Sequence, residues 1–305
     1  MTPSAVGHPA FAAAIDLANR SGRPLDEILR HHLLESLLRR LPQEPQAPAL
    51  VLRGSMIARL WASPYPRTAA DLDLLGTTPH DVAATADRIV PALAPDRAPV
   101  DDGVAFDTGR CTAKGIWLDT AFPGVRLAVF AQVFGAPATT TIDVGFGDPL
   151  VPDPIRVEYP WIAGGSAPVW AVHPATLIGW KLHGLAEWGR IRWRPKDALD
   201  LWLLVRRFGA EIPPAVLGEA VRVAFTSRGY AATDARRTLE DPFWRSPVAA
   251  ARWDRHGPWH GPGHDQRHGS GRGPAGAGAP PAPLDALFDA LLQGLGPALA
   301  AIEAG

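Results

Sequence analysis

Two aspartates separated by one residue, Asp71 and Asp73, begin the otherwise apolar stretch of residues 71–75. In a β-strand, residues i and i+2 project from the same face, so a strand here would direct both carboxylates to one point. Carboxylates side by side in a buried strand repel one another and lose hydration. A divalent cation such as Mg²⁺ relieves both penalties, because its preferred ligands are carboxylate, water and phosphate oxygens. The alternative interpretation is two aspartates at a strand end that simply meet solvent.

A third carboxylate, Asp143, lies in the segment TTTIDVGFGD, at the end of an apolar and β-rich run. If that strand pairs near residues 71–75, the three carboxylates share one site. Three such groups suit two metal ions about 4 Å apart, which clamp the attacking and leaving oxygens of an in-line phosphoryl transfer.

Upstream, Gly54 and Ser55 lie at a predicted turn from strand to helix. Glycine permits close approach of the backbone, and the free N–H groups of a helix N-terminus suit a triphosphate. The Ser55 hydroxyl can add one hydrogen bond. The alternative is an ordinary turn with a helix cap.

The elements that would position these residues follow from hydrophobic periodicity and from proline and glycine breaks. An amphipathic helix is predicted over residues 24–41, and a helix with Thr78 as its N-cap is predicted to reach about Leu93. Residues 147–169 hold five prolines and are predicted to form a loop. Strands are predicted over residues 49–52, 71–75, 125–133 and 139–144. Further helices are predicted over residues 56–61, 174–188, 195–208, 215–224, 231–239 and 284–302.

At roughly 100–200 residues per domain, 305 residues predict two domains in an α+β chain. We expect N-terminal helices over 1–45, a mixed-sheet α/β core over 46–169 and a helical domain over 170–305. A Gly/Pro/His-rich loop is expected at about 255–283. Histidines spaced by four in this loop would line up as metal ligands on a helix. Its glycines and prolines favour a flexible insertion instead.

In the helical half, Asp197 and Asp200 are three residues apart and therefore share a helix face. Lys196 lies in the first turn, where the helix dipole disfavours a cation, so an anionic neighbour is expected. Lys181 lies mid-helix among apolar residues. It either extends to solvent or points into a cleft, where it would bind a triphosphate as a point charge.

A second basic segment, residues 188–194, interleaves three arginines with two tryptophans. Such a strip can hold an RNA backbone and stack on exposed bases. The alternative is a solvated loop with partly buried tryptophans.

Five segments together resemble the AbiEii/AbiGii nucleotidyltransferase-toxin family, whose members are polymerase-β-like nucleotidyltransferases. The segments are VLRGSMIARLW, RTAADLDLL, TIDVGFGDPLVPDP, HPATLIGWKLHGL and RPKDALDLWLL, within residues 25–245. The resemblance implies a nucleotidyltransferase-type mixed β-sheet core flanked by helices, with a C-terminal helical domain.

The resemblance also implies roles for individual residues. Asp71 and Asp73 match the family's metal-binding pair, and Asp143 matches its third, catalytic carboxylate. The nucleotide-binding residues that it implies are Gly54, Ser55, Lys181, Lys196, Asp197 and Asp200. Two positions depart from the family pattern, because Ala70 replaces the usual basic residue before the aspartate pair and Trp180 replaces the glutamate before the lysine.

Composition excludes several classes of protein. A hydrophobic fraction of 47% and a net charge of −1 exclude a wholly disordered chain and a polybasic nucleic-acid coat. The single cysteine, Cys111, excludes an intramolecular disulfide and a CxxC zinc site. No basic signal sequence or long apolar run is evident, so a cytoplasmic location without a membrane partner is expected.

The function expected from these observations is metal-dependent transfer of a nucleoside monophosphate from an NTP to an acceptor hydroxyl. Mg²⁺ or Mn²⁺ is the expected cofactor, and the resemblance implies a toxin of a toxin–antitoxin pair, with a cognate antitoxin and tRNA 3′ ends as the acceptor. The alternatives are a small-molecule or protein acceptor, a non-catalytic nucleotide- or partner-binding domain, and a glycosyltransferase that uses the DxD motif for its metal.

Overall fold

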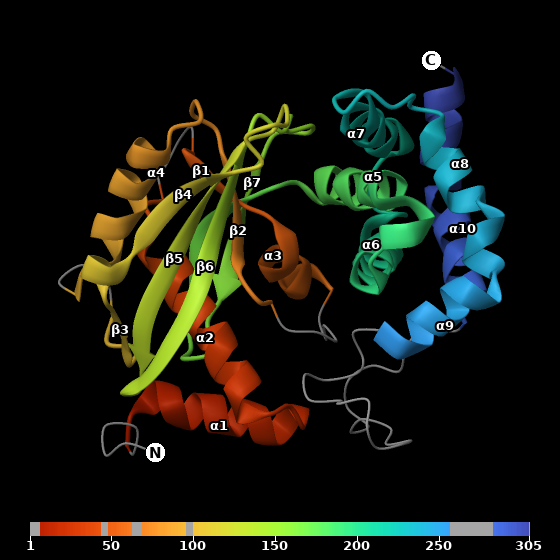
Figure 1. Cartoon of the computed structure of the whole chain (residues 1–305). Helices are drawn as coiled ribbons and strands as arrows, with labels where there is room; N and C mark the ends of the chain where they lie inside the picture. The colour runs from red at the N-terminus through yellow and green to blue at the C-terminus, as the bar shows by residue number, and fades with distance from the viewer. Residues whose placement is uncertain (1–6, 44–47, 63–68, 96–99, 257–282, 305) are drawn as a thin grey trace. The chain divides into compact units, whose positions relative to one another are not determined.

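The computed structural model describes residues 7–43, 48–62, 69–95, 100–256 and 283–304 (Figure 1). The chain divides into two compact units. The sheet unit comprises Met1–Ile57, Thr68–Asp148 and Ile155–Ala171. The helical unit comprises Ala58–Arg67, Pro149–Pro154 and Val172–Gly305.

The sheet unit is built on one mixed sheet of eight strands in the order β3-β5-β6-β2-β1-β8-β7, with β4 also paired to β5. The central strands β2 and β6 are parallel, whereas β5 and β6 form a long antiparallel hairpin. The strands are β1 (Leu50–Leu52), β2 (Leu72–Gly76), β3 (Val104–Phe106), β4 (Thr112–Ile116), β5 (Gly124–Val133), β6 (Ala136–Phe146), β7 (Ile155–Pro160) and β8 (Ser166–Ala171). The expected α+β fold with a mixed sheet is therefore confirmed.

Side-chain alternation divides this sheet into a buried and an open face. Along β5 the odd-numbered residues from Val125 to Val133 are buried, whereas the even-numbered residues from Arg126 to Gln132 are partly or fully exposed. This period of two is the expected signature of a strand with one face in the core. Helix α4 (Val82–Ile89) packs against β4 and β5. The even-numbered face of β5 is therefore available for chemistry.

Helix α2 (Leu25–Arg40) follows α1 (Pro9–Ser21) and differs from its sequence prediction. Its predicted boundaries are confirmed, but the amphipathic interpretation is wrong, because Glu27, Glu35 and Arg40 are buried as well as most of its leucines. The charges can be buried because they pair within the unit. Arg23 pairs with Glu27 at 2.8 Å and His31 pairs with Glu35 at 3.0 Å.

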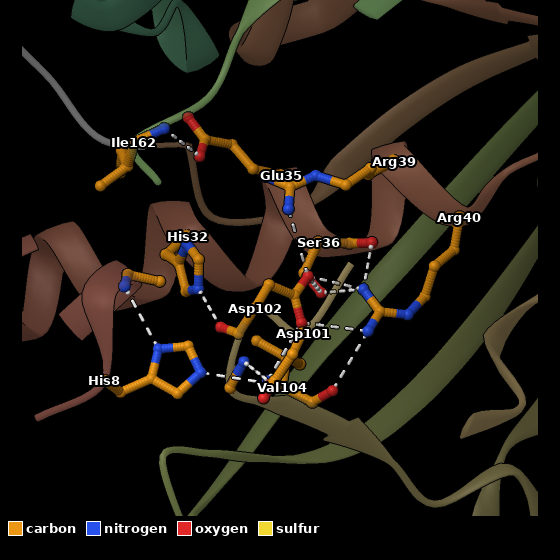
Figure 2. Close-up of polar contacts among 12 residues, drawn as sticks. His8, His32, Glu35, Ser36, Arg39, Arg40, Asp101, Asp102, Val104 and Ile162 are labelled. Carbon is orange, nitrogen blue, oxygen red and sulfur yellow. Dashed lines mark hydrogen bonds and ion pairs between the residues drawn. The ribbon is translucent and has the colours of Figure 1, made fainter. Parts of the chain in front are cut away.

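The C-terminal end of α2 is held by a buried carboxylate, Asp102 (Figure 2). Arg40 donates to both of its oxygens, from Nη1 at 2.8 Å and from Nη2 at 3.0 Å. Ser36 donates its hydroxyl at 2.7 Å, and the ring of His32 lies 2.8 Å from the Asp102 carbonyl oxygen. Burial raises the pKa of Asp102, but the hydrogen bonds and charge of Arg40 outweigh it and hold that pKa below its ordinary value.

The helical unit packs its helices around leucine and aromatic side chains. The Trp244 ring stacks on Phe288 with centroids 4.3 Å apart, and Trp193 meets Trp244 edge-on at 5.3 Å. Helix α10 is the one described helix that is long and apolar enough to cross a membrane. Its buried residues, which include Leu287, Leu291 and Leu295, pack within this unit. The helices that lie in this unit are α5 (Pro174–Arg192), α6 (Pro195–Phe208), α7 (Pro214–Thr226), α8 (Asp234–Glu240), α9 (Pro247–His256) and α10 (Leu284–Ala304).

Two sequence predictions differ from the structure, and a third concerns residues outside the described ranges. The helix expected from Thr78 begins instead at Val82, because the Asp81 side chain accepts from the Ala84 N–H and serves as N-cap. Residues 147–169 are not all loop, since they include β7 and the start of β8. Pro160 is tolerated there because β7 is an edge strand. The Gly/Pro/His-rich loop lies almost wholly outside the described residues.

We predict that Asp102→Asn lowers the free energy of unfolding by about 3–5 kcal/mol at neutral pH, because it leaves the buried Arg40 without its counter-charge. Chemical denaturation measures this loss. Asp101→Asn is the matched control, since the Asp101 side chain is 89% exposed and that of Asp102 is 1% exposed.

The same pair predicts a pH dependence. The pKa of Asp102 is lower in the folded protein than in the unfolded chain, so the unfolded state binds more protons in the acidic range. The stabilisation by Asp102 is complete above the ordinary aspartate pKa of about 4 and is lost as the pH falls through the lowered folded value. The difference between wild type and Asp102→Asn should therefore shrink at acidic pH. A difference that stayed constant down to the acid transition would contradict the prediction.

Candidate functional site

Three carboxylates meet on the open face of the sheet. Asp73 on β2 pairs directly with Asp143 on β6 in the parallel register, and Asp71 lies just before β2. One carboxylate oxygen from each of the three lies within 4.8 Å of the others. Asp71 and Asp73 are half-buried and Asp143 is buried. The sequence expectation that these residues converge is confirmed.

A guanidinium that the sequence analysis missed completes this cluster. Arg126 on β5 pairs with Asp143 in the antiparallel register, and its side chain is 40% exposed. Its Nε donates to Asp143 Oδ1 at 2.7 Å and its Nη2 donates to Oδ2 at 2.5 Å. The hydrogen bonds to Asp143, together with the charges of Asp143, Asp71 and Asp73, raise the pKa of Arg126. The sequence feature that could have identified Arg126 is its place among the polar, even-numbered residues of an alternating strand.

The turn before α3 (Gly54–Trp61) lies against the same carboxylates. Gly54 has a φ of +71°, and a Cβ atom at this position would lie 2.1 Å from Asp73 Oδ2. The Arg53 N–H donates to the Asp73 carbonyl oxygen at 3.0 Å, which fixes the turn to β2. Glycine is therefore required at residue 54 for two reasons. The backbone there has a left-handed conformation, and a side chain would collide with the Asp73 carboxylate. Ser55 is buried at the start of α3.

A second arginine, Arg53, crosses the open face beside this turn. Its Nη1 donates to Asp148 Oδ2 at 2.8 Å. A Cβ atom on Gly145 would lie 2.7 Å from Arg53 Nη2, so the absence of a side chain on β6 makes room for the guanidinium. Arg53 and Arg126 thus place two permanent cations on the face that carries the carboxylates.

The donor set fits a hard divalent cation. Carboxylate oxygens from three residues within 4.8 Å of one another are the ligands that Mg²⁺ and Mn²⁺ prefer. Each carboxylate oxygen has more than one lone pair, so the oxygens of Asp143 that accept from Arg126 can still reach a metal.

The helical unit holds the remaining predicted residues, and it brings three of them together. Lys181 Nζ lies 2.8 Å from Asp197 Oδ1 and 2.8 Å from Asp200 Oδ2. Arg194 Nε donates to Asp197 Oδ2 at 2.6 Å. Burial raises the pKa of Asp197, but the charges of Lys181 and Arg194 outweigh it and lower that pKa. Lys196 is exposed in the first turn of α6.

The shared lysine confirms that Asp197 and Asp200 lie on one helix face. Lys181 itself is only 14% exposed, so its ammonium is held by buried carboxylates rather than extended into water.

The basic strip of residues 188–194 is only partly exposed. Trp193 is buried, whereas Trp188 is 38% exposed with the Arg194 guanidinium 5.0 Å from its ring. Arg190 pairs with Asp241 at 3.0 Å. These contacts favour the interpretation of a solvated segment with partly buried tryptophans.

Solved structures that are similar to this chain include two proteins from Helicobacter pylori. The first is JHP933, with 13% identity and a TM-score of 0.48, over 92% of this chain and 93% of that one. The second is a candidate nucleotidyltransferase, with 14% identity and a TM-score of 0.47, over 90% of this chain and 95% of that one. No curated protein matches the sequence.

A family model matches residues 36–258, which include the three carboxylates, the Gly54–Ser55 turn and the Lys181 cluster. Its description is the nucleotidyl transferase AbiEii toxin of a type IV toxin–antitoxin system. The match extends over most of the chain, and so the protein belongs to the AbiEii nucleotidyltransferase toxin family.

Proposed function

We propose that this protein is a metal-dependent nucleotidyltransferase that moves a nucleoside monophosphate from an NTP to an acceptor hydroxyl. One observation carries the proposal. Three carboxylates from β2 and β6 converge within 4.8 Å, directly beside the glycine turn that begins a helix. That combination offers metal ligands and N–H donors for phosphate at the same place.

In the proposed reaction the acceptor oxygen attacks the α-phosphorus of the NTP. A new P–O bond forms, the bond to the bridging oxygen breaks, and pyrophosphate leaves with that electron pair. Asp71, Asp73 and Asp143 would hold Mg²⁺ or Mn²⁺, which supplies charge stabilisation for the transferred phosphoryl group. The backbone of Gly54 and the hydroxyl of Ser55 would bind the triphosphate.

Asp143 is the proposed acceptor of the hydroxyl proton. Arg126 fixes the plane of its carboxylate through two hydrogen bonds, which leaves the remaining lone pairs in a defined direction. Such preorganisation is what proton transfer at a fixed distance requires.

The finer parts of the proposal follow from the family. In a toxin–antitoxin system the protein would act on tRNA 3′ ends in the cytoplasm and be opposed by a cognate antitoxin. Lys181 and Lys196 are proposed to bind nucleotide phosphates, with Asp197 and Asp200 holding Lys181 in place.

Radiolabelled NTPs incubated separately with tRNA, protein and small-molecule pools test the acceptor class. Label in tRNA supports the proposal, and label in protein or small molecules supports the alternative acceptors. Absence of both transfer and NTP binding would favour a partner-binding domain.

We predict that Asp73→Asn weakens Mn²⁺ binding at least tenfold and slows label transfer on the order of 100-fold or more, because it removes one of three converging carboxylates. Calorimetric titration with Mn²⁺ measures the first effect without turnover. Asp87→Asn is the control, since Asp87 is an exposed carboxylate on α4. Equal Mn²⁺ affinity in wild type and Asp73→Asn would refute the metal site.

We predict that Gly54→Ala also abolishes transfer, because the new methyl group would displace the Asp73 carboxylate. Gly164→Ala is the matched control. Gly164 likewise has a positive φ, of +92°, but a Cβ atom at that position would have no other atom within 4 Å. Both variants lose about 1–2 kcal/mol of stability, because alanine must adopt a positive φ at each position. Only Gly54→Ala should also lose Mn²⁺ affinity.

We predict that Lys181→Met lowers the free energy of unfolding by about 3 kcal/mol or more, because buried Asp200 loses its lysine. Denaturant titration measures this cost. NTP binding to the variant, measured where the variant remains folded, tests the phosphate role independently. Normal NTP affinity in folded Lys181→Met would assign the lysine to stability alone.

A further inference from the structure

The open face of the sheet continues beyond the carboxylates along β4, β5 and β6. The strand registers place Lys114, Arg126, Asp143 and Asp73 in one row across four strands. Directly paired residues project from the same face of a sheet. Farther along the hairpin, Phe130 pairs with Thr139 on that face. This surface, from Lys114 to Thr139 on β4, β5 and β6, is called the hairpin face below.

The hairpin face carries cations that lack carboxylate partners within the described chain. Lys114 is exposed and lies directly opposite Arg126, an arrangement of like charges that destabilises a sheet. Arg126 is balanced by Asp143, whereas neither Lys114 nor Arg110 forms an ion pair with any described residue. An anion bound along this face would relieve that repulsion.

A cavity of about 530 Å³ opens on the same face near Phe130. The Arg110 guanidinium lies 4.2 Å from the centre of the Phe130 ring. Polar groups of Thr108, Gln132 and Thr139 also line the cavity. Aromatic rings and guanidinium planes are the groups on which proteins stack unpaired bases, and hydroxyl and amide groups can bond to base edges.

The spacing of these features suits a strand of nucleic acid. Phe130 is four residues from Arg126 along β5, which is about 13 Å at the rise of an antiparallel strand. A stacked strand covers that distance in roughly four nucleotides at 3.4 Å each. The Gly54 turn contacts Asp73 from the β1 side, whereas Lys114 and Arg126 flank Asp143 from the β5 side. The donor triphosphate and the acceptor would then approach the carboxylates from opposite sides.

We propose that the hairpin face binds the acceptor as single-stranded RNA. Lys114 and Arg126 contact its phosphates, and a base about four nucleotides from the reacting hydroxyl enters the cavity and stacks against the exposed side of the Arg110–Phe130 pair. The inference rests on the proposed nucleotidyl transfer to RNA and adds the surface on which the acceptor lies.

The test measures fluorescence anisotropy of a labelled 12-nucleotide RNA at several salt concentrations, without NTP. The double variant Arg110→Ala/Lys114→Ala should bind more weakly, because it removes a phosphate contact and part of the stacking surface. Its slope of log K against log salt should fall by about 0.7, the contribution of the one lost phosphate contact of Lys114. Phe130→Leu keeps an apolar side chain but removes the ring. It should weaken binding at least fivefold with an unchanged slope.

Arg20→Ala/Arg30→Ala is the matched control, because it removes two exposed arginines from α1 and α2 of the same unit. It should bind RNA as wild type does. Wild-type affinity and slope in Arg110→Ala/Lys114→Ala would overturn the proposal, as would a wild-type protein that binds no RNA and labels a protein acceptor. Mn²⁺ and NTP titrations separate the two claims. If Mn²⁺ and NTP bind normally while substitutions on the hairpin face leave RNA affinity unchanged, the proposed acceptor surface is wrong. The proposed nucleotidyl transfer is then unaffected.

Discussion

The pairing of Asp73 with Asp143 is the constraint on which the rest of the site depends. The parallel register of β2 and β6 sets two carboxylates opposite one another, an arrangement that is destabilising without a cation. Arg126 supplies one from β5, and its two hydrogen bonds orient Asp143. Three carboxylates within 4.8 Å of one another concentrate negative charge at this point, which attracts a divalent cation.

Buried charges elsewhere in the chain are paired with fixed side chains of opposite charge. Asp102 receives hydrogen bonds from Arg40 and Ser36, and Lys181 is enclosed by Asp197 and Asp200. In both places fixed side chains oppose the buried charge, which is how an interior tolerates ions. These clusters stabilise their own units. On the open face Asp71 and Asp73 are only half-buried, and this access to solvent suits reversible binding of a cation.

Local patterns in the sequence were sufficient for most elements and for the carboxylates. Runs rich in Val, Thr, Phe and Ile between glycine and proline breaks predicted β5 and β6, and the spacing of Asp71 and Asp73 predicted a shared direction. The register of β5 against β6 was not predictable in this way, so Arg126 was missed although the two strands form a hairpin and Arg126 lies only 17 residues from Asp143. The burial of α2 was missed for a related reason, because its partner Asp102 lies 62 residues from Arg40.

The departure at Ala70 shows why position in sequence and position in space must be considered separately. The family usually has a basic residue just before its aspartate pair, and an alanine here removes a cation from that place. The electrostatic requirement concerns the carboxylates themselves, since Coulomb energy depends on distance and not on chain order. Arg126 supplies a cation close to the carboxylates from another strand, β5. Its hydrogen bonds to Asp143 and the charges of Asp143, Asp71 and Asp73 raise its pKa. A single antiparallel register, Arg126 opposite Asp143, therefore gives this chain a cation beside its carboxylates without one at residue 70.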